Sequence, residues 1–120
     1  LLYPKRGIAS LGPLVIKASA GNVFRAPIIR CDATVSAVAA LRAKGYEVAT
    51  LEASGETSLF EFKAVDSVVC VLGGESDGIG REVAALADNR LSIPMANGVE
   101  SLNVAVTAAL VSFRLGQTPD

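Results

Sequence analysis

Apolar residues along the chain alternate between short runs that are typical of strands and spaced patterns that are typical of helices. Strands are predicted by apolar or alternating runs at 26–31, 46–51, 67–72 and 90–95. Helices are predicted where apolar residues recur at helical spacing, at 33–45, 79–87 and 101–113. Strands that alternate with helices indicate an α/β fold with a mostly parallel sheet flanked by helices.

Individual residues refine these elements. Asp32 offers a capping oxygen to the first helix, and Gly45 ends it. The run 67–72 is apolar on both faces, which predicts a central strand covered by helices. The last helix carries one predicted buried stripe, formed by Leu102, Val106, Ala109, Leu110 and Phe113.

Three other segments are less regular. Residues 53–58 form a predicted polar loop, and 1–3 resemble the tail of a strand. Residues 12–21 indicate a weak helix or a loop. The chain opens on an apolar segment without methionine, so we expect it to be cut from a longer protein.

Composition limits the size and the partners of the fold. A chain of 120 residues with 51% apolar residues can bury one core, so we expect one domain. The net charge of -1 argues against a nucleic-acid surface that depends on bulk charge. Five cations nevertheless precede Asp32, the first acid, and they form either a face for phosphates or an ordinary solvated surface: Lys5, Arg6, Lys17, Arg25 and Arg30.

The residue types also exclude some chemistry. The chain has no histidine, which excludes mechanisms that need imidazole as base or ligand. Cys31 and Cys70 are far apart in apolar segments, so we expect buried free thiols in a reducing compartment, with neither a disulfide nor a metal site. No apolar run approaches the length of a membrane span, which predicts a cytoplasmic protein.

The segment VLGGESDGIG, residues 71–80, places four glycines directly after the most apolar run. Either it is a tight turn, or it lets a ligand approach the backbone at the carboxyl end of a strand. In parallel sheets ligands bind beyond these ends, so the loops after Leu51, Leu72 and Met95 should converge on one site. Glu75 and Asp77 would repel phosphate, which favours an uncharged or cationic ligand.

The segment IPMANGVESLNV, residues 93–104, makes a ligand site more plausible. Pro94 fixes the exit from a strand, and Ser101 is suited to cap the following helix. Asn103 in a first helical turn competes with helical hydrogen bonding unless its side chain has another partner.

The two segments VLGGESDGIGREV and LSIPMANGVESLNVAVTAAL closely resemble the second and third motifs of the SpoU (TrmH-like) branch of the SPOUT RNA methyltransferases, and KASAGNVFRAPI is similar to the segment before them. The resemblance covers nearly the whole chain. It implies a catalytic domain over 1–120 with a C-terminal trefoil knot, and a homodimer. It also implies S-adenosylmethionine as the methyl donor to a ribose 2′-hydroxyl of RNA, ribosomal first and transfer RNA second, without a metal.

The resemblance also assigns residues. Those implied in cofactor binding are Thr50, Leu51, Leu72, Gly73, Gly74, Ile93, Met95, Ser101 and Leu102. Those that match polar positions of the active site are Glu75, Ser101 and Asn103. The family's first motif, which supplies a key arginine, is expected just before Leu1. Arg25, Arg30 and Arg81 are the predicted RNA contacts.

Two other functions remain open. One is a non-catalytic module for cofactor binding or dimerisation on the same fold. The other is a nucleotide-binding α/β domain of another family, which would prefer a phosphorylated nucleotide to S-adenosylhomocysteine.

Overall fold

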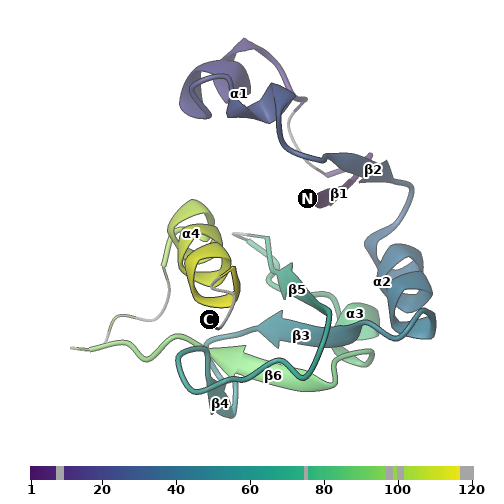
Figure 1. Cartoon of the computed structure of the whole chain (residues 1–120), viewed down its shortest axis with the longest axis vertical. Coiled ribbons are helices and arrows are strands. Elements are labelled where there is room, and N and C mark those ends of the chain that lie inside the picture. The colour runs from purple at the N-terminus through teal and green to yellow at the C-terminus, as the bar shows by residue number, and fades with distance from the viewer. Residues whose placement is uncertain (8–9, 75, 97–98, 100–101, 117–120) are drawn as a thin grey trace. The chain divides into compact units, whose positions relative to one another are not determined.

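The computed structural model describes residues 1–7, 10–74, 76–96, 99 and 102–116. The chain forms two compact units, unit 1 (Leu1–Ala37) and unit 2 (Val38–Asp120), each with its own sheet (Figure 1). The boundary between them lies inside helix α2 (Thr34–Ala43).

Unit 1 contains a small parallel sheet. Its first elements, in chain order, are β1 (Leu2–Pro4), α1 (Pro13–Ala18), η1 (Asn22–Phe24) and β2 (Ile29–Cys31). β1 pairs with β2 in parallel, with Tyr3 opposite Arg30. Both predicted strands of this region are therefore confirmed, and the undecided segment 12–21 contains a helix. The predicted capping residue Asp32 forms an ion pair with Lys5 across the sheet end.

Unit 2 contains a four-stranded parallel sheet with helices packed on it. Its strands are β3 (Glu47–Leu51), β4 (Thr57–Ser58), β5 (Val68–Leu72) and β6 (Asn89–Ser92), in the spatial order β4-β6-β3-β5. All three strand pairs are parallel, which confirms the predicted α/β class with a mostly parallel sheet. The segment 53–58 is not purely a loop, because its last two residues form β4.

The predicted central position of the run 67–72 is wrong. Within the part of the chain that the structure describes, β5 pairs with β3 alone and lies at an edge of the sheet. Val71 is buried, while the other residues of β5 are half-buried. An apolar pattern on both faces depends on what covers the strand from above and below, so it carries no information about lateral neighbours.

The core of unit 2 lies between the sheet and helix α4 (Val104–Leu115). Ala49, Leu59, Phe62, Leu91 and Val111 are buried together in one cluster. Arg114 of α4 donates to the Phe62 carbonyl at 2.9 Å and so fixes the rotation of the helix on the sheet.

The buried stripe predicted for the last helix is largely wrong. Val111 is the buried residue of α4, whereas Phe113 is 71% and Val106 48% exposed. Leu110 does pack against the core, as predicted. Apolar residues occur on every side of this helix, so periodicity alone could not tell its buried face from its exposed face.

The helix predicted over 79–87 is shorter in the structure. Helix α3 spans Arg81–Ala84, and Val83 is its buried residue. Its continuation is stopped because Asp88 already donates its backbone N–H to the Val48 carbonyl at 2.8 Å, one residue before β6 begins. In the described part of the chain, no helix has the length and apolar character needed to cross a membrane.

Candidate functional site

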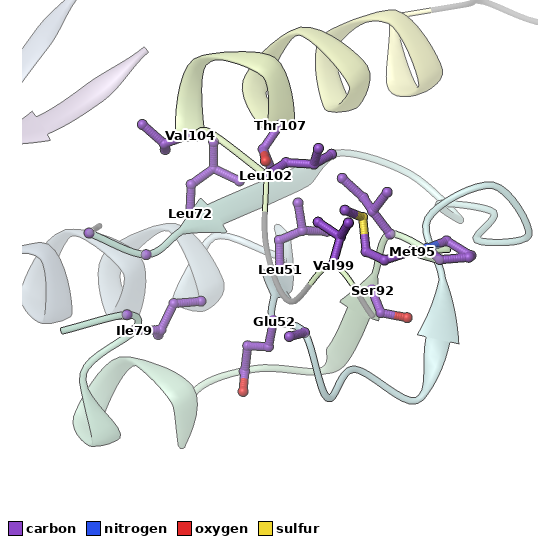
Figure 2. Close-up of a pocket in the computed structure, with 16 residues that line it drawn as sticks. Leu51, Glu52, Leu72, Ile79, Ser92, Met95, Val99, Leu102, Val104 and Thr107 are labelled. Carbon is purple, nitrogen blue, oxygen red and sulfur yellow. The ribbon is translucent and has the colours of Figure 1, made fainter. Parts of the chain in front are cut away.

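The loops at the carboxyl ends of three strands converge on one cavity of unit 2, as predicted. The cavity has a volume of about 840 Å³ (Figure 2). Its described lining residues come from the loops after β3, β5 and β6 and from the start of α4: Leu51, Glu52, Ala53, Leu72, Gly73, Gly74, Gly78, Ile79, Ser92, Ile93, Pro94, Met95, Val99, Leu102, Val104 and Thr107. Most of these side chains are apolar, and Glu52 is the one ionisable group among them.

The glycine-rich loop closes on itself by backbone hydrogen bonds. Gly74 and Gly78 bond to each other in both directions, at 3.0 and 3.1 Å. Gly78 has φ +64, which favours glycine, and a Cβ on Gly73 would lie 2.6 Å from the backbone of Gly78. The predicted turn is therefore real, and it brings the Gly73–Gly74 backbone to the cavity wall. A Cβ on Gly74 would meet nothing within 4 Å, so the cavity reaches the main chain there.

Gly55 is a second close approach, which the sequence analysis missed. A Cβ on this residue would lie 2.3 Å from both the carbonyl carbon and the oxygen of Leu91. The loop after β3 therefore packs directly on the backbone of β6. A glycine four residues after the end of a predicted strand was the available signal.

Glu52 is fixed at the cavity wall by two donors. The Thr50 hydroxyl donates to its Oε1 at 2.8 Å, and Arg90 Nη2 donates to its Oε2 at 2.7 Å. The Glu52 side chain is 19% exposed. The hydrogen bond from Arg90 is the largest cause that lowers the pKa of Glu52, so the carboxylate is ionised at neutral pH.

Seven of the nine predicted cofactor residues line the cavity: Leu51, Leu72, Gly73, Gly74, Ile93, Met95 and Leu102. Thr50 does not, because its side chain is fully buried and its hydroxyl bonds to Glu52. Ser101, the ninth, and Glu75 lie outside the described residues.

Asn103 has the partner that its position required. It is the N-cap of α4 rather than a residue of the first turn, so the prediction of Ser101 as the cap is wrong. The Oδ1 of Asn103 accepts the backbone N–H of Ala105 at 2.8 Å. Its neighbours Leu102 and Val104 both line the cavity. The exposed amide nitrogen of Asn103 has no acceptor among the described residues, so its two hydrogens can bind a ligand.

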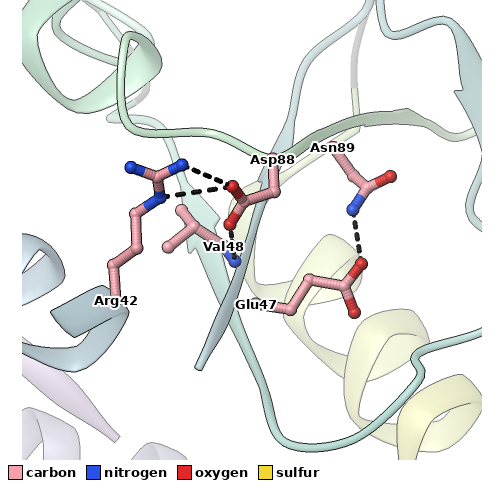
Figure 3. Close-up of polar contacts among 5 residues, drawn as sticks. All are labelled: Arg42, Glu47, Val48, Asp88 and Asn89. Carbon is pink, nitrogen blue, oxygen red and sulfur yellow. Dashed lines mark hydrogen bonds and ion pairs between the residues drawn. The ribbon is translucent and has the colours of Figure 1, made fainter. Parts of the chain in front are cut away.

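A second hollow of about 670 Å³ lies at the opposite, amino ends of the strands. Three of its four charged residues form side-chain hydrogen bonds: Arg42, Glu47 and Asp88. Asp88 accepts from Arg42 Nη2 at 2.8 Å and from the Val48 N–H at 2.9 Å, and Asn89 donates to Glu47 at 2.6 Å (Figure 3). These contacts tie α2, β3 and β6 together.

The cysteines are free and half-buried in the structure. Burial, with a smaller contribution from the charge of Glu47, raises the pKa of Cys70 to about 11. Its thiol is therefore protonated at neutral pH and is a poor nucleophile. Among the residues that the structure describes, no group of His, Cys, Asp and Glu side chains could hold a metal ion.

The predicted RNA contacts are divided between the units. Arg25 and Arg30 are exposed in unit 1, and Arg81 is exposed at the first residue of α3 in unit 2. Lys5 of the basic run is paired with Asp32.

Comparison with known proteins extends these observations. Residues 1–113 match the SpoU rRNA Methylase family. An uncharacterized tRNA/rRNA methyltransferase of Mycobacterium tuberculosis is 36% identical over 111 residues, which are 92% of this chain and 34% of that protein. The chain thus spans about a third of the length of the curated relatives it matches.

Solved structures agree in fold. A TrmH-family structure from Porphyromonas gingivalis has 32% identity and a TM-score of 0.80, over 94% of this chain and 46% of that one. An AdoMet-bound rRNA methyltransferase from Sinorhizobium meliloti has 25% identity and a TM-score of 0.84, over 94% of this chain and 43% of that one. With a family match over residues 1–113 and a cavity where the motifs of that family meet, this chain belongs to the SpoU rRNA methylase family.

Proposed function

We propose that the protein containing this chain is an S-adenosylmethionine-dependent RNA methyltransferase. The proposed acceptor is a ribose 2′-hydroxyl in ribosomal RNA, with transfer RNA as the second candidate. The observation that carries the proposal is the meeting of three strand-end loops at one largely apolar cavity. In this proposal residues 1–120 form part of one catalytic domain, and the trefoil knot and the cytoplasmic location stay predictions.

The cavity suits the proposed cofactor in size and chemistry. A volume of about 840 Å³ lies within the range of small-molecule sites, roughly 300–1,000 Å³. Ile93, Met95 and Leu102 supply apolar contacts for an adenine ring. The open space beside Gly74 lets a ligand reach the main chain, whose polar groups can bind an uncharged nucleoside. In the S. meliloti structure, AdoMet is bound to a protein of the same fold.

The residues of this chain have a limited set of chemical tasks. S-adenosylmethionine, when bound, supplies a methyl group that is already activated. The chain must therefore hold the acceptor hydroxyl in line and assist the loss of its proton. We assign orientation of the hydroxyl to the Asn103 amide and to Ser101. The candidates for proton transfer are Glu75, an arginine, and a water molecule held by Ser101 and Asn103.

RNA binding is assigned to Arg25, Arg30 and Arg81. Exposed arginines can neutralise phosphates, and the first 31 residues hold five cations and no acid. We expect the double variant Arg25→Ala/Arg30→Ala of the full protein to bind RNA more weakly and with a smaller salt slope. An unchanged slope would exclude these two residues from the interface.

Helix α4 supports the proposed homodimer. Phe113 and Val106 are exposed on it, and Ala109 lies between them at helical spacing. Such an apolar strip is suited to a second copy of the chain. We expect the full protein to sediment as a dimer at micromolar concentration and the variant Phe113→Ser/Val106→Ser to dissociate. A wild-type monomer would contradict the dimer.

The alternative is a non-catalytic module that binds the cofactor without methyl transfer. It is favoured by one observation, that the Asn103 oxygen caps α4 and so already has a structural task. The variant Asn103→Ser distinguishes the capping role of Asn103 from its proposed role in methyl transfer, because serine also caps helices but lacks the amide. The enzyme hypothesis predicts cofactor binding without methyl transfer in this variant of an active parent protein.

The first test is calorimetric titration of the full protein with S-adenosylhomocysteine. Gly74→Leu should abolish binding by filling the cavity, since its side chain has room in the folded protein. Gly80→Leu is the matched control, because a Cβ on Gly80 also meets nothing within 4 Å and Gly80 is not among the described lining residues. Gly73 is unsuitable for this test, since its side chain would clash with Gly78. A folded wild-type protein that binds no S-adenosylhomocysteine would contradict the proposed function.

A further inference from the structure

We propose that Glu52 is a specificity residue that accepts hydrogen bonds from both ribose hydroxyls of the nucleoside in the cavity. The inference rests on the proposed function, since it concerns the cofactor that the cavity would bind. It adds a residue that lies outside the motifs on which the family resemblance depends.

The position of Glu52 is rigid. It follows the last residue of β3, and its backbone N–H donates to the Leu91 carbonyl of β6 at 2.8 Å. The side chain is then held by Thr50, which is fully buried, and by Arg90 from β6. In Figure 2 it lies below Leu51, between Ile79 and Ser92, at the wall of the cavity. A carboxylate fixed on two strands is pre-organised for a ligand.

The hydrogen-bonding capacity of the carboxylate fits a vicinal diol. Each carboxylate oxygen can accept about two hydrogen bonds. Thr50 uses one position on Oε1, and Arg90 uses one on Oε2. No other donor among the described residues bonds to this carboxylate, so one acceptor position remains on each oxygen, and two adjacent hydroxyls could occupy both. An acidic side chain at the carboxyl end of a parallel strand has this task in dinucleotide-binding folds, which are otherwise unrelated.

The charge of the pair favours a neutral donor over a cation. Arg90 Nη2 lies 2.7 Å from Glu52 Oε2, so the two charges compensate each other at the cavity wall. A ligand ammonium or sulfonium group therefore gains little from Glu52. A neutral hydroxyl still gains a hydrogen bond to an ionised acceptor, which is stronger than a bond between neutral groups.

The test compares S-adenosylhomocysteine with its 2′-deoxy and 3′-deoxy analogues by calorimetric titration of the full protein. In the wild type each missing hydroxyl should weaken binding about tenfold or more, as expected for hydrogen bonds to a charged group. In Glu52→Ala the parent ligand should bind more weakly, and the difference between it and either analogue should nearly vanish. Equal losses in wild type and variant would overturn the inference and leave the proposed function intact.

The variant Arg90→Gln tests whether Glu52 binds the ribose hydroxyls or only links β3 to β6. It removes the ion pair of Glu52 but keeps the carboxylate, so discrimination against the deoxy analogues should persist. If Glu52 only ties β3 to β6, both variants should lower the unfolding temperature and neither should change the discrimination. The wild-type comparison needs no substitution, so wild-type protein that binds all three ligands equally would also overturn the inference. Wild type that binds none of them would overturn the proposed function together with it.

Discussion

The two ends of the four-stranded sheet of unit 2 use their polar groups in opposite ways. At the amino ends, side chains are bonded to each other and to the backbone: Asp88 accepts from Arg42 and from the Val48 N–H, and Asn89 donates to Glu47. At the carboxyl ends the lining is mainly apolar or glycine, and one ionisable side chain lies among the described lining residues.

This difference indicates that the amino ends of the strands serve mainly to stabilise the fold and the carboxyl ends mainly to bind a ligand. Groups that satisfy each other stabilise the sheet but have little capacity left for a ligand. The exception at the amino ends is Glu47 Oε2, which is buried and has no hydrogen-bond partner among the described residues. At the carboxyl ends Glu52 keeps free acceptor positions, and Gly74 leaves its backbone open to the cavity. Substitutions at the amino ends should therefore change stability alone, and most of those at the carboxyl ends should change ligand binding.

Gly55→Ala should have the largest effect on stability. It is an exception among substitutions at the carboxyl ends, because it should lower stability rather than change ligand binding. Its Cβ would approach Leu91 to 2.3 Å, so either the loop or β6 must move. We expect a loss of roughly 2–4 kcal/mol in the free energy of unfolding, measured with urea. Gly80→Ala is the control, with little loss, because its Cβ enters open space. Equal stability of the two variants would contradict the close approach.

Asp88→Ala tests the amino ends. Val48 is fully buried, and its N–H would lose the acceptor that Asp88 provides at 2.9 Å. A buried donor without a partner costs about 1–3 kcal/mol, which should appear in urea unfolding. Asp88→Asn retains an acceptor oxygen and should lose less. Affinity for S-adenosylhomocysteine should not change in either variant, and a large change would break the division between the two ends.

Acid should weaken the same contact. The hydrogen bond from Arg42 is the first cause, and that from Val48 the second, that lower the pKa of Asp88 below its ordinary value of 3.8. The unfolded chain therefore binds the proton of Asp88 more readily than the folded chain does. The ionised carboxylate stabilises the folded state above about pH 4, and this contribution is lost as the pH falls through the lower folded-state pKa. The stability difference between wild type and Asp88→Asn should shrink as the pH falls below about 4. A difference that grows in acid would contradict the assignment.

The sequence predicted the location of the site better than its contacts. The convergence of the loops after Leu51 and Leu72 follows from parallel strands alone, because their carboxyl ends lie at one edge. The tasks of Gly55 and Glu52 depend on β6, which is more than 30 residues away in the chain, so no local pattern could indicate them. The exposure of Phe113 likewise depends on how Arg114 is anchored to the loop after β4.

Arg42→Met and Arg90→Met should have the smallest effects, and together they compare the two ends most directly. The arginine side chains are 50% and 49% exposed, and their ion pairs measure 2.8 and 2.7 Å. Exposed ion pairs contribute about 0–1 kcal/mol, so urea unfolding should show two similar and small losses.

The two arginine variants should differ in ligand binding instead. Arg42→Met should leave the affinity for S-adenosylhomocysteine unchanged, because its partner Asp88 is remote from the cavity lining. Arg90→Met leaves the negative charge of Glu52 uncompensated. The affinity for S-adenosylmethionine, which carries a positive sulfonium, should therefore rise relative to the affinity for S-adenosylhomocysteine. If both arginine variants bind the two ligands in the wild-type ratio, the charge of Glu52 does not act on the sulfonium group, and the two ends of the sheet are alike in this respect.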